Sequence, residues 1–189
     1  MRRLLGSAII LVAFCSISPA ADPTPEDAVA LLNKMKAKVR PPKEKNPDKI
    51  VAIDLGRKKV TNDDLKSIGV LTKVRELNLG GPILKEKGGK TIFEPKQIDD
   101  DGLQHLVGLT ELTSLQLDGT HITDAGLKHL AGMKKLRTLI LSNTQVTDEG
   151  MEQLTKLPKL ENVMLLETKI TETGVGVLKR WKSEINITR

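Results

Sequence analysis

The sequence is poor in aromatic side chains and in cysteine. Its 189 residues include no tyrosine, two phenylalanines, one tryptophan and one cysteine. Platforms that stack single-stranded nucleic acid or sugar rings need several aromatic side chains, so this class of ligand is disfavoured. The one cysteine, Cys15, lies near the N-terminus. The rest of the chain therefore contains no disulfide and no thiol nucleophile.

Catalytic motifs are also missing from the sequence. There is no nucleophile elbow, no HExxH motif and no pair of carboxylates placed beside a general base. Gly89-Lys90-Thr91 is similar to the end of a phosphate-binding loop, but Leu84 stands where that motif requires glycine. The sequence therefore predicts a protein that is not an enzyme and that has no cofactor and no catalytic residue.

Two groups of residues are candidate metal ligands. His105 and His129 occupy equivalent positions 24 residues apart, with His121 nearby, and Asp99-Asp100-Asp101 form an acidic run. Two histidines without a third ligand do not complete a zinc site, and acidic residues also favour the first turn of a helix. We interpret both groups as solvated surface and expect no metal.

The first twenty residues have the pattern of a secretory signal peptide. Arg2 and Arg3 precede the apolar run Leu4–Ile17, and the small-residue segment Ser18-Pro19-Ala20 follows it. We predict a signal peptide over 1–20 and export to the periplasm or the extracellular space. A lipoprotein anchored through Cys15 is the alternative, although Phe14 fits the lipobox poorly.

Residues 21–49 are predicted to be an N-terminal capping helix followed by a linker. Thr24 and Pro25 are typical of a helix start, and an apolar stripe follows. The lysines on the other face leave open a membrane-surface or partner helix, but the open end of a repeat array requires a cap. The residues of the stripe are Val29, Leu32, Met35 and Val39.

The central feature of the chain is a 24-residue repeat, written three times in a row from Leu112 to Ser183. Each repeat alternates as a short strand does and then continues with the three-residue apolar spacing of a helix. The threonine before each helix is a candidate N-cap, and an early glycine in the helix predicts close packing against the next coil. The aligned sets are Leu115, Leu139 and Val163; Thr120, Thr144 and Thr168; Thr123, Thr147 and Thr171; Gly126, Gly150 and Gly174.

This pattern, L-x-x-L-x-L-x-x-T-x-[IV]-T-D-x-G-L-x-x-L, resembles the leucine-rich repeat family. It is most similar to the ribonuclease-inhibitor-like subclass with I-T-D-x-G-L, and to exported bacterial repeat proteins. The resemblance implies an α/β solenoid with a parallel β-sheet on the concave face and short helices on the convex face. Where the family usually has asparagine or cysteine, this chain has threonine, so we expect a ladder of hydroxyl-to-backbone hydrogen bonds.

Residues 50–189 are predicted to form the repeat unit, with about five 24-residue coils and a terminal strand over Ile185–Thr188. Trp181 is expected to pack over the last coil. The second coil is interrupted by about fourteen extra residues. Turn-forming Gly88-Gly89 lies between two short apolar pieces, which predicts a β-hairpin at about 81–96. We expect this insertion to replace no consensus position of the repeat.

The residues that alternate with the buried strand leucines should have their side chains exposed on the concave face. The last two coils place Ile140, Met164 and Leu166 there, and exposed apolar clusters mark contact sites. We therefore expect a monomeric, non-catalytic protein-binding module that has another protein as its partner, without nucleic acid or a membrane span. A recognition protein for an anionic envelope polymer, bound by surface lysines, is the alternative. The predicted partner-binding residues are Ile140, Met164, Leu166, Gln116, Thr138 and Asn162.

Overall fold

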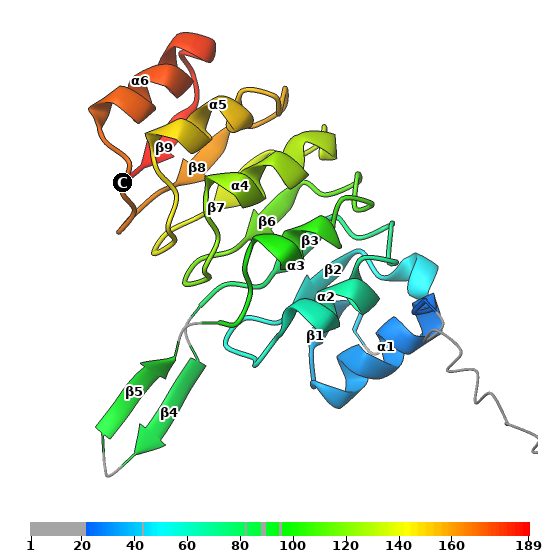
Figure 1. Ribbon diagram of the computed structural model, residues 1–189. Coiled ribbons are helices and arrows are strands. Elements are labelled where there is room, and N and C mark those ends of the chain that lie inside the picture. Colours follow the sequence, from blue (N-terminus) through cyan, green and yellow to red (C-terminus); the bar gives the residue numbers. More distant parts are fainter. Residues whose placement is uncertain (1–21, 43, 82, 88–89, 95) are drawn as a thin grey trace, which may run out of the picture.

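The computed structural model describes residues 22–42, 44–81, 83–87, 90–94 and 96–189, with no side chains given for 83–94. Its main body is a curved stack of coils in which short helices line one face of a sheet (Figure 1). The predicted signal peptide lies outside the described residues. None of the helices in these ranges is long and apolar enough to cross a membrane.

The sheet has seven strands in the order β1-β2-β3-β6-β7-β8-β9, and all neighbours are parallel except β1 and β2. Its strands are β1 (Lys38–Arg40), β2 (Ala52–Asp54), β3 (Glu76–Asn78), β6 (Ser114–Gln116), β7 (Thr138–Ile140), β8 (Asn162–Met164) and β9 (Asn186–Thr188). The helices are α1 (Pro25–Lys34), α2 (Asn62–Ile68), α3 (Asp100–Gln104), α4 (Asp124–Leu127), α5 (Met151–Leu154) and α6 (Glu172–Trp181), with 3₁₀ turns η1 (Pro47–Lys49), η2 (Lys128–Gly132) and η3 (Asp148–Gly150).

In β3, β6, β7 and β8 the central residue is buried and its two neighbours in the strand are not. Leu115, Leu139 and Val163 are in register across β6, β7 and β8, and none has any exposed surface. Ile140, the next residue after Leu139, is half-buried on the opposite side of the sheet. The alternation predicted from the sequence is therefore confirmed, and it separates one apolar core from an open concave face.

The threonine ladder is confirmed as hydroxyl-to-backbone bonding. The hydroxyl of Thr120 donates to the Leu117 carbonyl at 2.6 Å, inside the same coil. Thr144 and Thr168 repeat this bond to Leu141 and Leu165 at 2.6 and 2.7 Å. Each bond satisfies a carbonyl at the corner where the chain leaves the strand.

A second set of bonds joins each coil to the next. Asp100 accepts from the backbone N–H of Thr123 at 2.9 Å and from its hydroxyl at 2.5 Å, one coil along. Asp124 with Thr147 and Asp148 with Thr171 make the same pair of bonds, and for Asp148 the Thr171 bonds hold its pKa below the usual range. The aspartate of the T-D-x-G motif therefore connects coils, in addition to lying in a helix N-terminal turn.

These aspartates also explain the glycine of the motif. A Cβ added to Gly126 would lie 2.2 Å from Oδ1 of Asp100, which is a clash. Our expectation of packing against the next coil was wrong in direction, because the close approach comes from the preceding coil. Asp64 replaces the glycine in the first repeat, where it completes a capping box with Thr61 instead.

The N-terminal helix covers the first coil but is shorter than the apolar stripe predicts. Thr24 and Asp27 form a capping box at its start, and Ala28, Val29 and Leu32 are buried. The helix ends at Lys34, so the prediction that Val39 continues it was wrong. Lys36 adopts a left-handed backbone with φ of 51°, which turns the chain into β1. Val39 then pairs with Ile53 on the edge of the sheet.

The insertion in the second coil is an antiparallel hairpin of β4 (Ile83–Lys87) and β5 (Lys90–Glu94). It projects away from the solenoid at a strand-to-helix corner (Figure 1). Its base is held by the third coil, because Gly81 N–H donates to the Asp118 carbonyl at 3.0 Å and Lys96 N–H to the Gly119 carbonyl at 3.2 Å. The hairpin therefore leaves the solenoid from a fixed base.

Candidate functional site on the concave face

The concave face is formed by the outward-pointing residues of consecutive strands. Gln116, Ile140 and Met164 lie opposite one another in register on β6, β7 and β8. Neighbouring strands are about 4.8 Å apart, so these side chains form one continuous row. Three residues predicted to bind a partner are therefore brought side by side.

The other predicted residues lie on either side of this row along the strands. Thr138 lies opposite Asn162 in register, and Asn162 accepts a hydrogen bond from the amide of Asn186 at 3.2 Å. Leu166 follows β8, is 41% exposed, and comes directly after the buried Leu165. The structure thus gathers all six predicted residues on three neighbouring coils.

A hollow on this face lies at the other end of the sheet, where the sequence predicted no site. It has a volume of about 370 Å³ and lies over β1, β2, β3 and β6. Lys38 and Arg40 enter it from the edge strand β1, and Arg40 forms an ion pair with Glu76 across the sheet. The polar–apolar–polar alternation of Lys38, Val39 and Arg40 is typical of a strand and could have indicated β1. The apolar stripe of the predicted N-terminal helix instead included Val39.

The acidic residues near this hollow support the backbone at the strand ends. Asp54 Oδ1 accepts from Gly56 N–H at 2.8 Å and from the Asn78 amide at 2.9 Å. Asp118 accepts from Gly81 N–H at 2.8 Å. These side chains stabilise turns, and no general base lies beside a nucleophile among them.

Lys96 is a buried charge that sequence reasoning missed. Its side chain has no exposed surface, and its ammonium donates to the Leu55 carbonyl at 2.8 Å. Burial lowers the pKa of Lys96 to about 8, while Asp118 and Asp54 act to raise it. Lys96 occupies the ladder position of the second coil, two residues before Ile98, so the expectation that the insertion replaces no consensus position was wrong.

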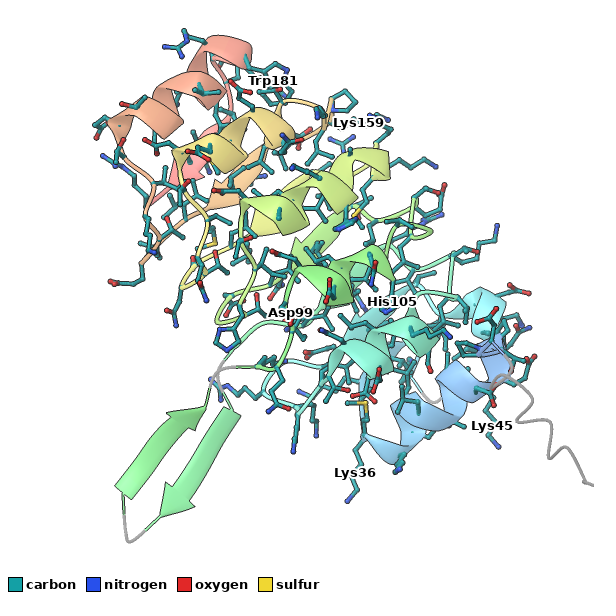
Figure 2. All side chains as sticks on the ribbon, viewed as in Figure 1. Lys36, Lys45, Asp99, His105, Lys159 and Trp181 are labelled. Carbon is teal, nitrogen blue, oxygen red and sulfur yellow. The ribbon has the colours of Figure 1, made fainter. Side chains whose placement is uncertain are left out.

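The candidate metal ligands lie apart from this face. Asp99 caps α3 and Asp100 holds Thr123, so both carboxylates have structural partners. Figure 2 shows Asp99 and His105 at the two ends of this short helix. In the described part of the chain, no group of three histidine, cysteine or acidic residues has metal-binding geometry. The Gly89-Lys90-Thr91 motif lies partly outside the described residues.

Comparisons with known proteins agree with this architecture. Residues 109–131 and 132–154 each match the model of the leucine-rich repeat. Together with the parallel sheet and its row of short helices, these matches show an α/β leucine-rich-repeat fold. A search of curated protein sequences found no match.

Solved structures that are similar to this chain include three bacterial proteins. A leucine-rich-repeat protein of Leptospira interrogans aligns with a TM-score of 0.49 and 18% identity, covering 69% of this chain and 29% of that protein. An internalin of Listeria monocytogenes aligns at 0.41 and 20% identity, covering 69% and 38%. Internalin C2 of the same organism aligns at 0.39 and 20% identity, covering 90% and 99%. The chain thus spans less than half the length of the first two.

Proposed function

We propose that this leucine-rich-repeat chain is a non-catalytic protein-binding module that acts after export. Leucine-rich-repeat domains commonly mediate protein interactions. We infer a division into a signal peptide over 1–20, a capping helix and linker over 21–49, and a repeat unit over 50–189. The apolar run near the N-terminus supports export, and the packing of α1 on the first coil supports the capping role.

The proposed contact surface is the C-terminal part of the concave face. We call Ile140, Met164 and Leu166 the apolar patch. The observation that carries the proposal is the register of Ile140 with Met164, together with the 41% exposure of Leu166. Large apolar side chains grouped on an open surface favour contact with a partner. Gln116, Thr138 and Asn162 supply polar groups around the patch.

The test is partner capture with a triple variant, Ile140→Ser, Met164→Ser and Leu166→Ser. Buried apolar contacts near an interface centre carry most of the binding energy, so capture from an envelope extract should be lost. Circular dichroism should stay native, because these side chains lie outside the core.

The matched control is the double variant Val51→Ser and Val107→Ser. These valines are 37% and 49% exposed and lie outside the patch, so the control should capture the same partner as the unaltered protein. Equal capture by the triple variant and the unaltered protein would refute a contact through the apolar patch.

A further inference from the structure

From α3 onward, acidic residues gather at the starts of the helices, whereas the helix-to-strand turns of the last three coils are rich in lysine and arginine. In the coils, each helix from α2 to α6 follows a strand-to-helix corner and ends toward a helix-to-strand turn. Acidic residues favour helix N-termini and basic residues favour C-termini, so a repeated coil places opposite charges on opposite edges. The acidic edge carries Asp99, Asp101, Asp124, Asp148 and Glu149. In Figure 2, Lys159 lies away from the hairpin, on the side opposite this edge.

The helix-to-strand turns of the last three coils form a basic edge. We define it by Lys134, Lys135, Lys156, Lys159, Arg180 and Lys182. Five of these side chains are exposed and Lys182 is half-buried. The edge spans both the ends of the helices and the segments before the strands, so its cations cover an area and not a single line.

Several of these lysines are held in place without losing their charge. Lys134 donates to the Lys156 carbonyl at 3.1 Å, and Lys182 donates to the Leu160 carbonyl at 2.9 Å. The Lys156 ammonium donates to the side-chain oxygen of Gln153 at 2.7 Å. A neutral oxygen orders an ammonium group but does not neutralise it, so these cations remain available to an anion.

The carboxylates of the same turns offset only part of this charge. Glu111 pairs with Lys135 at 2.7 Å, and Glu161 forms an ion pair with Arg137. Glu152 and Glu184 are exposed nearby. Ion pairs between the described residues therefore involve one of the six cations that define the basic edge.

Two apolar side chains lie on the same edge. Val107, in the turn after α3, is 49% exposed. Trp181 is half-buried at the end of α6, with the Lys182 ammonium 5.9 Å from its ring centre. Tryptophan with adjacent lysine is favoured at the headgroup level of a bilayer, where the ring meets lipid and the ammonium meets phosphate.

We propose that the basic edge docks on an anionic phospholipid surface. A two-dimensional array of ordered cations matches a plane of lipid headgroups better than it matches a single linear polyanion. The scarcity of aromatic residues disfavours single-stranded nucleic acid. This docking leaves the concave face open, because the turns lie along the border of the sheet and not over it.

The test is vesicle binding by the chain that begins at Asp22, which contains the whole hydrophobic core and lacks the apolar N-terminal run. Vesicles contain phosphatidylcholine and phosphatidylglycerol at a ratio of about 3 to 1, or phosphatidylcholine alone. We expect binding to the anionic vesicles only, weakened by salt, with a blue shift of Trp181 fluorescence. Each lysine near an anionic surface contributes about 1 kcal/mol, so Lys156→Gln, Lys159→Gln and Lys182→Gln together should lower the partition coefficient about 100-fold.

The matched control neutralises three exposed lysines elsewhere, by Lys36→Gln, Lys45→Gln and Lys59→Gln. Figure 2 shows Lys36 and Lys45 at the other end of the solenoid from Lys159. The control should change the partition coefficient by less than about threefold, since the change of net charge is the same but the surface is distant. Equal losses in the two variants would show that net charge, and not this edge, drives binding. Binding to long-chain polyphosphate without binding to anionic vesicles would also overturn the proposal.

Discussion

Single residues decide how the coils of this protein fit together. The aspartate of each T-D-x-G motif binds the threonine of the following coil and lies against its glycine, so three residue types act as one contact. Lys96 shows the opposite case, a residue that departs from the repeat. Its ammonium reaches the preceding coil to bind Leu55, where the later coils use a short threonine within one coil.

The buried Lys96 makes stability depend on pH. Its pKa is lowered from 10.5 to about 8 in the folded protein, so the unfolded chain binds more protons between these values. The free energy of unfolding should therefore rise with pH in this window, with a slope from this group of up to about 1.4 kcal/mol per pH unit. Denaturant titrations of Lys96→Met should lack this contribution.

Lys59→Met is the control for this measurement, because Lys59 is exposed. Its profile between pH 8 and 10.5 should follow that of the unaltered protein. Identical profiles for Lys96→Met and Lys59→Met would mean that Lys96 is not buried in solution.

At the scale of elements, one coil is connected to the next by strand pairing, core packing and the aspartate contact. Each helix has ten residues or fewer, and α4 and α5 have four each. Helices this short are not stable alone, and they form because their apolar faces pack on the sheet. The glycine in the T-D-x-G motif therefore serves contact between coils, although it lowers helix propensity.

Two glycine substitutions test this contact. At Gly150 a Cβ would lie 2.2 Å from Asp124 Oδ1 and 2.8 Å from Leu127 Cδ1, so Gly150→Ala should destabilise the protein by about 1–3 kcal/mol. At Gly132 the nearest atom is the Val107 carbonyl oxygen at 3.7 Å, so Gly132→Ala should be neutral or stabilising by up to about 1 kcal/mol. Denaturant titration measures both, and a Gly150→Ala protein as stable as Gly132→Ala would contradict the close approach.

At the scale of the whole molecule, the different surfaces of the solenoid face in different directions. The convex side carries the helices and the concave side carries the open strand residues (Figure 1). From α3 onward the helix starts are acidic, and the helix-to-strand turns of the last three coils are basic. The proposed protein contact and the proposed lipid contact therefore lie on different sides of one stack of coils.

This separation predicts that the two activities can be lost independently. The triple serine variant of the apolar patch should lose partner capture and keep vesicle binding, whereas the triple glutamine variant of the basic edge should do the reverse. Substitutions with no shared contacts act additively, so a protein with all six changes should lose both by the amounts measured singly. Loss of both activities in either triple variant would show that the two surfaces are not separate.

The sequence by itself determined the repeating part of this protein. The 24-residue period, the buried strand leucines, the helix caps and the threonine ladder all follow from periodicity and from local hydrogen bonding. These interactions lie within one coil or between identical neighbours, so one repeat is informative about the next. The same reasoning placed Gln116, Ile140 and Met164 in one row, because equivalent positions of adjacent coils become paired.

Only the tertiary structure decided the features that occur once. The antiparallel pairing of Val39 with Ile53, the hollow beside Arg40 and Glu76, and the burial of Lys96 depend on segments that do not repeat. Helical periodicity could not show that Lys36 reverses the chain, and a lysine in a Pro- and Gly-rich insertion gives no sign of burial. In each case the partner lies in another coil or across the cap, and contacts at such separations leave no periodic trace in the sequence.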